Sequence, residues 1–438
     1  MSMRIAFYLE NGNIPNVDLS RPELGNPGCG GTEFLFAALP FYLASLDGDT
    51  VQPVLLANHT GLLPPSLEVH LVSNILDAAQ RAKNMKCAFF VYRPKRFEEP
   101  GLYALLNQLK IPSIAWLHVT PTNPQLRALG ANAHIKAVVC VEHEQHEALR
   151  DTEAAHKLTY IVNGLDCGNF NVSENTERDP RLIIYLGALV PQKGFHLLAR
   201  AWPRIMRRSP DARLAVIGSG SLYGPEARLG SWGIAAELYE EQHIKPYLRG
   251  PDGKPLPSVQ FLGRLGIEKK ELLCKAAVGV VNPSGQTENC PGSALEFQAY
   301  GTPVVSGAFY GMLDTVRHRE TGLLGRTLDD LVENICRLMV DSKLARRLGE
   351  NGPGFVRHRY NFPGVTRQWV DLFHKLDEGK KPTPMPYKTN IHRHFKWLVY
   401  INQFPQATLG RFLWWPSVLE LKEFASSILK KLRLWRRA

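Results

Sequence analysis

The sequence lacks the features that place a protein in a membrane or outside the cell. None of its apolar runs reaches the roughly 18 uncharged residues of a spanning helix, and the apolar stretch 5–9 is too short for a signal peptide. We therefore expect the mature protein to begin at Met1. The seven cysteines are scattered and form no Cys-x-x-Cys pair, which argues against a disulfide framework or a zinc site and favours a reducing, cytoplasmic compartment.

Motifs for a catalytic metal are also missing. Asp47-Gly48-Asp49 lies in a turn pattern, and the run 142–147 lacks the His-Glu-x-x-His order because Glu147 stands four residues beyond His143. We interpret residues 142–147 as the solvated start of a helix. We expect no metal ion and no cofactor.

The excess of basic residues is confined to one end of the chain. The net charge is +11, and the segment from Gly379 onward carries seven Lys and five Arg against two Glu. No nucleic-acid-binding module accompanies this charge, so we expect no nucleic-acid partner. A basic segment rich in Trp is typical of helices that bind an anionic membrane surface. Packing against the body of the protein with the basic face in water explains the pattern equally well.

Short apolar segments alternate with helix-like segments along most of the chain. This alternation, over a length sufficient for two cores, predicts two doubly wound α/β domains. The first half contains predicted strands at residues 4–9, 51–56, 69–72, 88–92, 113–117 and 137–141, and the second at 182–186, 214–217, 278–281 and 304–305.

Residues 278–305 form the unit around which the rest of the chain is organised. A buried strand, a loop, a helix that starts near Gly292 and a second strand follow one another, and parallel sheets bind ligands beyond the carboxyl ends of their strands. The N–H groups at Gly292 to Ala294 would suit a diphosphate. Glu288 would then face what the diphosphate carries, and Glu296 would bind a diol. The pattern predicts a nucleotide-sugar site.

Glu288 and Glu296, followed by the run Gly301-Thr302-Pro303-Val304-Val305, resemble the signature of the retaining GT-B glycosyltransferases of family 4, also called group 1. The resemblance implies a GT-B fold, in which two Rossmann-like domains face a central cleft. It also implies that Glu288 lies near the donor sugar and that Glu296 binds the ribose hydroxyls.

Further positions match the same family. The Gly30-Gly31 loop after the first strand resembles the glycine loop that approaches the donor phosphates and the acceptor. His118 ends a predicted strand, where a family histidine lies beside the transferred sugar; a structural role for this histidine is as plausible from the sequence. Lys193 would meet the leaving diphosphate. Ala188 stands where the family has an arginine, and Arg264 is a candidate to replace it.

The resemblance, with a connector at residues 159–170, divides the chain into segments. We predict an acceptor-side domain at 1–172, a donor domain at 178–360, a crossover helix at 361–378 that returns to the first domain, and a basic aromatic tail at 379–438. Helices are also expected at 223–250, 331–348 and 362–376. The complete set of candidate site residues is catalytic His118, Lys193 and Glu288, and donor-binding Gly30, Gly31, Gly218, Arg264, Asn289, Cys290, Pro291, Gly292, Ser293, Ala294 and Glu296.

The sequence therefore predicts a retaining, metal-independent glycosyltransferase. It would move a sugar from a nucleotide-diphosphate sugar to a glycan or lipid-linked acceptor in polysaccharide or glycolipid assembly, in the cytoplasm or on the inner face of a membrane. Two alternatives stay open. A nucleotide-sugar 2-epimerase has the same architecture, and Ala188 makes a non-catalytic nucleotide-sugar-binding scaffold conceivable.

Overall fold

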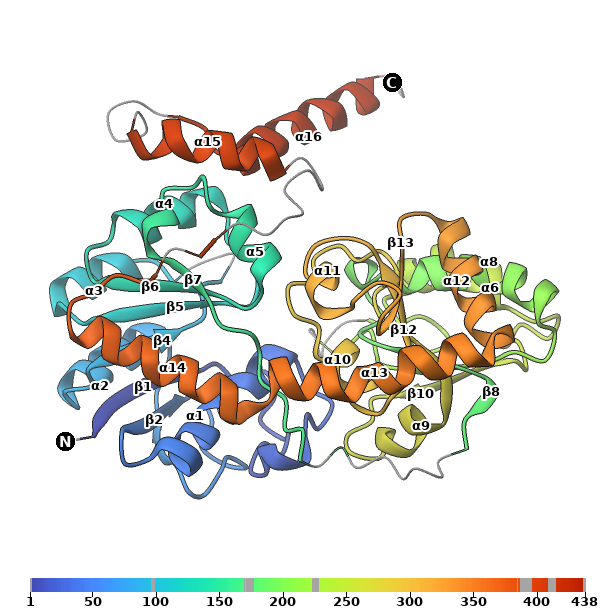
Figure 1. Ribbon diagram of the computed structural model, residues 1–438, viewed down its shortest axis with the longest axis horizontal. Helices are drawn as coiled ribbons and strands as arrows, with labels where there is room; N and C mark the ends of the chain where they lie inside the picture. Colours follow the sequence, from blue (N-terminus) through green and yellow to red (C-terminus); the bar gives the residue numbers. More distant parts are fainter. Residues whose placement is uncertain are drawn as a thin grey trace.

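The computed structural model describes residues 2–95, 99–168, 170, 177–222, 228–383, 385–386, 396–408 and 415–435. Two parallel sheets with helices packed around them lie side by side along the longest axis of the molecule (Figure 1). Each sheet is built from one half of the chain. The predicted class, two doubly wound α/β domains, is confirmed.

The N-terminal sheet has the strand order β3-β2-β1-β4-β5-β6-β7. Its strands are β1 (Met3–Leu9), β2 (Val51–Ala57), β3 (Glu68–Leu71), β4 (Phe89–Tyr92), β5 (Ser113–Leu117), β6 (Ile135–Cys140) and β7 (Leu158–Tyr160). The helices between them are η1 (Pro22–Leu24), α1 (Gly31–Asp47), α2 (Ile75–Asn84), α3 (Leu102–Leu109), α4 (Asn123–Ala131), α5 (His143–Ala148) and η2 (Ala155–Lys157). The central strands are buried on both faces, which is why they read as continuous apolar runs.

The C-terminal sheet has the order β10-β9-β8-β11-β12-β13. Its strands are β8 (Asp179–Leu186), β9 (Arg213–Ile217), β10 (Val259–Gly263), β11 (Ala276–Val280), β12 (Val304–Gly307) and β13 (Gly322–Gly325). Its helices are η3 (Pro191–Lys193), α6 (Phe195–Arg208), α7 (Glu237–Tyr239), the π-helical η4 (Glu240–Ile244), α8 (Lys245–Leu248), α9 (Lys269–Lys275), α10 (Gly292–Ala299), α11 (Met312–Thr315) and α12 (Leu328–Val340). The central predicted unit is thus β11, α10 and β12. Of the helix expected at 223–250, residues 223–227 lie outside the described residues, and helical structure covers 237–248.

Two consecutive helices connect the domains. α13 (Ser342–Tyr360) lies on the C-terminal domain, and α14 (Phe362–Asp377) continues onto the N-terminal domain (Figure 1). Trp369 of α14 packs edge-on against Trp116 of β5, with ring centroids 5.2 Å apart. The prediction of one helix at 331–348 is wrong, because Asp341 ends α12 and its side chain accepts a hydrogen bond of 2.9 Å from the Leu344 N–H to begin α13.

The segment that we expected to be solvated, residues 142–147, is buried. The Glu142 carboxylate accepts hydrogen bonds from the Tyr360 hydroxyl at 2.6 Å and from Arg359 at 2.7 Å. The Glu144 N–H donates to Asp314 of α11 at 2.6 Å. The expectation was wrong because α5 lies where the two domains meet the crossover helices, so its polar side chains find partners from distant parts of the chain.

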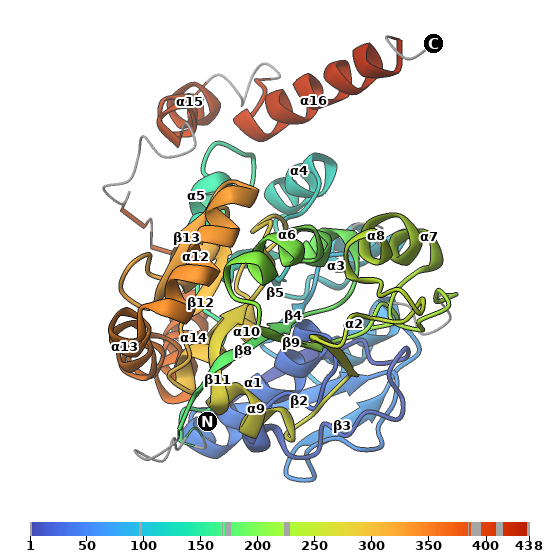
Figure 2. The ribbon, with the colours of Figure 1, turned by 90° about the vertical axis from the view of Figure 1, so that its right-hand side faces the viewer.

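The tail folds into α15 (Lys396–Thr408) and α16 (Val418–Trp435), which lie over α4 and α5 (Figures 1 and 2). The Lys396 ammonium donates to Glu144 at 2.5 Å and to Glu147 at 2.7 Å, and the Asp151 carboxylate accepts from the Val418 N–H at 2.6 Å. The inner face of the tail therefore packs on the body. Within the described ranges, no helix has the length and apolar character needed to cross a membrane.

Candidate active site

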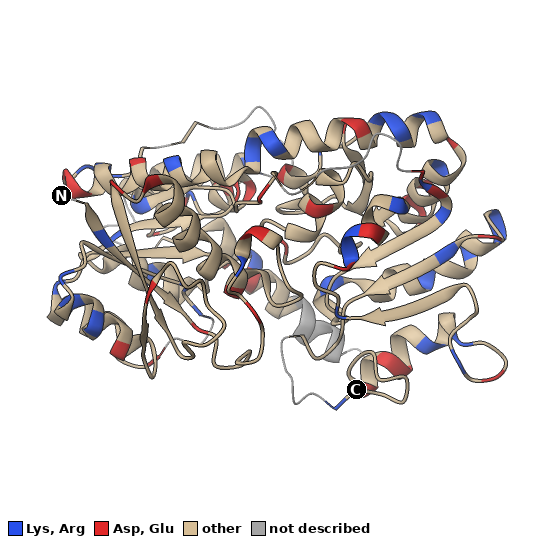
Figure 3. Ribbon diagram, turned by 90° about the horizontal axis from the view of Figure 1, so that it is seen from below, with Lys and Arg blue, Asp and Glu red and all other residues tan. Residues whose placement is uncertain are grey.

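A cavity of about 580 Å³ lies between the two domains. The order of strands reverses between β1 and β4 in the N-terminal sheet and between β8 and β11 in the C-terminal sheet. Ligands of open α/β sheets bind beyond the carboxyl ends of the strands at such a reversal. The loops at both reversals contribute to this cavity, and residues of both charge signs lie in the region between the domains (Figure 3).

An ion pair lies at the reversal of the C-terminal sheet. The Lys193 ammonium, at the end of η3, lies 2.6 Å from Oε1 of Glu288, and the Asn282 side-chain amide donates to the same oxygen at 3.0 Å. Glu288 is 7% exposed. Gly194 has a φ of +67°, and a Cβ there would lie 2.9 Å from the Ser284 nitrogen. Glycine therefore allows the loops after β8 and β11 to approach and hold the pair together.

The N-terminus of α10 opens onto the same cavity. Gly292 and Ser293 line it, and the first N–H groups of a helix have no acceptor within the helix. Ala294, which we also expected here, is fully buried and absent from the lining, and its N–H donates to the Pro291 carbonyl at 3.1 Å. Further along the helix, Oε2 of Glu296 lies 3.2 Å from the Lys269 ammonium. This end of the cavity can therefore receive a diphosphate beside a diol.

His118 lies on the opposite wall, directly after β5. Its ring packs against Trp116 and Phe36, with centroids 4.4 and 5.7 Å away. Burial and, to a smaller extent, the charge of Arg93 lower the pKa of His118 to about 3, so the imidazole is neutral at physiological pH. Its buried Nε2 has no hydrogen-bond partner among the described residues. The Asn289 side chain donates to the His118 carbonyl at 3.0 Å and so joins the two walls.

The other predicted residues are divided between the cavity wall and its support. Gly31, Gly218, Arg264, Cys290 and Pro291 line the cavity. Gly30 is the N-cap of α1 and is absent from the lining. At Gly218, where φ is +145°, a Cβ would collide with the carbonyl of Gly187. Ala188 gives this wall no charge, whereas Arg264 lines the same cavity and extends from the end of β10.

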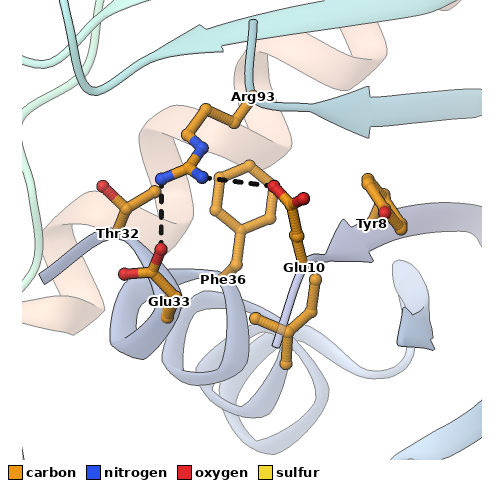
Figure 4. A pocket seen from close by; sticks show the side chains of 7 residues that line it. Tyr8, Glu10, Thr32, Glu33, Phe36 and Arg93 are labelled. Atoms are coloured by element: carbon orange, nitrogen blue, oxygen red, sulfur yellow. Dashed lines mark hydrogen bonds and ion pairs between the residues drawn. The ribbon is translucent and has the colours of Figure 1, made fainter. Parts of the chain in front are cut away.

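Several charged residues of the cavity were not predicted from the sequence. The Lys269 ammonium, besides pairing with Glu296, donates to the Asn26 carbonyl of the N-terminal domain at 2.9 Å. Arg93 and Glu33 line the N-terminal wall, where Arg93 lies between the carboxylates of Glu33 and Glu10 (Figure 4). The position of Arg93 immediately after a predicted strand was the one available signal. Lys269, in an ordinary helical segment, had none.

Comparison with solved structures defines the class of fold. The chain matches a sucrose-phosphate synthase from Thermosynechococcus elongatus with a TM-score of 0.62 at 18% identity, over 86% of this chain and all of that one. It matches the Anabaena protein HepE in complex with UDP with a TM-score of 0.62 at 16% identity, again over 86% of this chain and all of the other. The predicted two-domain GT-B fold is confirmed.

Sequence comparison then finds related glycosyltransferases. Residues 169–355 match the family model described as "Glycosyl transferases group 1". An uncharacterized glycosyltransferase of Methanocaldococcus jannaschii is 28% identical over 207 residues, and the alignment covers 47% of each chain, about half the length of that relative. A D-inositol 3-phosphate glycosyltransferase of Kribbella flavida is 25% identical over 403 residues, 80% of this chain and 86% of the relative. The resemblance to the group 1 glycosyltransferases is therefore confirmed over residues 169–355, most of the C-terminal domain.

Proposed function

We propose that the protein is a retaining, metal-independent glycosyltransferase that moves a sugar from a nucleotide-diphosphate sugar to an acceptor hydroxyl of a glycan or a lipid-linked precursor. One observation carries this proposal. The Lys193–Glu288 pair, the N-terminus of α10 and the Glu296–Lys269 pair all surround one cavity, across from His118.

Each of these groups has a different role in the reaction. The α10 N-terminus, Lys193 and Arg264 stabilise the negative charge that grows on the diphosphate as its bond to the anomeric carbon breaks. Glu288 is held by two donors, which suits it to binding sugar hydroxyls rather than to attack on the anomeric carbon. The acceptor oxygen forms the new bond to that carbon, and its proton passes to the departing phosphate. Neutral His118 hydrogen-bonds a sugar hydroxyl through Nε2.

Turnover with a panel of UDP-, GDP- and ADP-sugars tests this function. We expect release of free nucleotide diphosphate together with a transferred sugar whose anomeric configuration, read by NMR, is retained, and no loss of rate in EDTA. Isomerised donor without free nucleotide would identify the epimerase. Binding of nucleotide sugar without turnover of any donor would identify the scaffold.

We also propose that the outer face of the tail binds an anionic membrane surface, which would place the enzyme beside a lipid-linked acceptor. Apolar side chains project from both tail helices, with exposed fractions of 56% at Ile401, 57% at Phe404 and 68% at Phe424. The basic C-terminal sequence would add attraction to anionic lipid. Flotation with vesicles containing anionic lipid tests this proposal. Phe424→Ser should weaken flotation, whereas Leu71→Ser, which changes an exposed apolar residue of β3, should not.

A further inference from the structure

The reversal of strand order in the N-terminal sheet carries a charged cluster of its own. Glu10 follows β1 and Arg93 follows β4, the two strands between which the order reverses. Their side chains form an ion pair of 3.3 Å, and Arg93 also lies 3.2 Å from Glu33 in the first turn of α1 (Figure 4). This position in the sheet corresponds to that of the Lys193–Glu288 pair in the other domain.

The cluster is balanced in charge. Lys95 forms an ion pair with Glu10, so two cations face two carboxylates. Burial of this cluster is partial, since the side chains of Glu33 and Arg93 are 14% and 25% exposed. On the C-terminal wall, by contrast, Lys193, Arg264 and Lys269 outnumber Glu288 and Glu296, which leaves an excess of one positive charge besides the positive end of α10.

A balanced cluster discriminates between ligands by their charge. Hydroxyl groups both donate to carboxylate oxygens and accept from a guanidinium, so a polyhydroxylated ligand finds partners for both roles. A phosphate or carboxylate would bring its negative charge close to two glutamates, in a partly desolvated site where like charges repel strongly. The guanidinium that would attract the anion is already occupied by these glutamates.

The cluster also lies where an acceptor must be. Arg93, Glu33 and Thr32 line the same cavity as Lys193 and Glu288, from the opposite domain. An acceptor held there presents a hydroxyl toward the donor sugar. Arg93 and His118 line the same wall of this cavity, and the charge of Arg93 contributes, after burial, to the lowered pKa of His118.

We propose that Glu10, Glu33 and Arg93 form the acceptor subsite and that they select an uncharged saccharide over an acceptor with a phosphate or carboxylate near its reacting hydroxyl. This inference rests on the proposed function. Glu33 and Arg93 bind acceptor hydroxyls directly, and Glu10 fixes the guanidinium and completes the charge balance.

The experiment compares uncharged with negatively charged acceptors, both in the rate of transfer and in binding. Transfer is measured from the donor that the wild type uses, with methyl α-glycosides of gluco-, manno- and galacto-configuration and with inositol phosphate as acceptors. Binding of the same compounds in the presence of nucleotide diphosphate is measured by calorimetry. The variants are Glu33→Gln and the double variant E10Q/E33Q. Glu68→Gln is the matched control. It removes a carboxylate of β3 that forms an ion pair of 2.7 Å with Arg4 of β1.

We expect the wild type to prefer one of the glycosides to inositol phosphate by at least tenfold. E10Q/E33Q should shift this ratio at least tenfold toward inositol phosphate, whereas Glu68→Gln should leave the ratio as it is. A merely structural role for the cluster would lower all rates together and leave the ratio unmoved, which overturns the proposal. Wild-type preference for inositol phosphate, or no binding of any glycoside, also overturns it.

Failure of the proposed function has a different signature. In that case the wild type turns over no donor with any acceptor, while the calorimetric ratio between glycosides and inositol phosphate still decides whether the cluster selects uncharged ligands.

Discussion

The two domains carry comparable ion pairs at the same place in their sheets but surround them differently. In the C-terminal domain the Lys193–Glu288 pair is joined by a helix N-terminus and by further cations, so this wall favours a diphosphate. In the N-terminal domain Arg93 is enclosed by Glu10 and Glu33, and Lys95 pairs with Glu10, so the wall has no excess charge. One architecture thus provides an anion site and a neutral site that face each other, and local charge decides the ligand of each.

Removal of one cation from each wall should have the largest effect and tests most directly whether the two walls have different roles. Lys193→Ala should lower donor hydrolysis about 100- to 1,000-fold, because it removes a charge that stabilises the departing diphosphate. Arg93→Ala should leave donor hydrolysis within about threefold of wild type and lower transfer to the acceptor instead. Steady-state rates with and without acceptor check both. Equal loss of hydrolysis in the two variants would contradict the division between the walls.

Glycine-to-alanine substitutions test how rigidly each wall is built. Gly218→Ala should lower the free energy of unfolding by about 1–3 kcal/mol and weaken donor binding, because φ is +145° and the new Cβ would meet the Gly187 carbonyl. Gly30→Ala should cost less, because its Cβ meets only the movable carboxylate of Glu33. Chemical denaturation and calorimetry with nucleotide diphosphate measure the two effects. A larger loss of stability in Gly30→Ala would reverse the expected order.

Burial of His118 in the N-terminal wall should make the stability of the protein depend on pH, with a smaller effect than the substitutions above. The folded protein holds the pKa of this residue at about 3, whereas the unfolded chain has the ordinary value near 6.5. As the pH falls below 6.5 the unfolded state gains a proton that the folded state does not, so stability decreases, by at most about 2 kcal/mol at pH 5.

His118→Gln should remove this dependence. Denaturation at pH 7 and pH 5 should therefore show a smaller loss for the variant than for the wild type. The ratio of their transfer rates should stay constant over this range, because His118 is neutral throughout. A rate ratio that titrates near pH 6.5 would show that the imidazole becomes charged in the folded protein.

Local patterns in the sequence were sufficient to predict the strands and the unit formed by β11, α10 and β12. Apolar runs define buried parallel strands, and the spacing of Glu288 and Glu296 places both beside one helix terminus. The break at Asp341 was missed because apolar periodicity continues across it. The burial of α5 and the positions of Lys269 and Glu10 were missed for another reason. Their partners are distant in the sequence, as for Glu10 and Arg93, and only the packing of the domains brings them together.

The smallest expected effect concerns the contact between the walls themselves. Asn289→Ala removes the hydrogen bond from its side chain to the His118 carbonyl, a neutral bond worth about 1 kcal/mol. Because this bond joins the two domains, we expect a higher KM for the donor and a broader distribution of domain arrangements in small-angle scattering, with little change in kcat.

Asn132→Ala is the matched control for this substitution. Its side-chain amide donates to the Tyr103 carbonyl at 3.0 Å and its side-chain oxygen accepts from the His134 N–H at 2.9 Å, both within the N-terminal domain, so the control should lose at least as much stability without changing the donor KM. If both variants alter KM equally, the effect comes from general destabilisation. If only Asn289→Ala does, the anion site and the neutral site depend on a bond between the walls to face each other correctly.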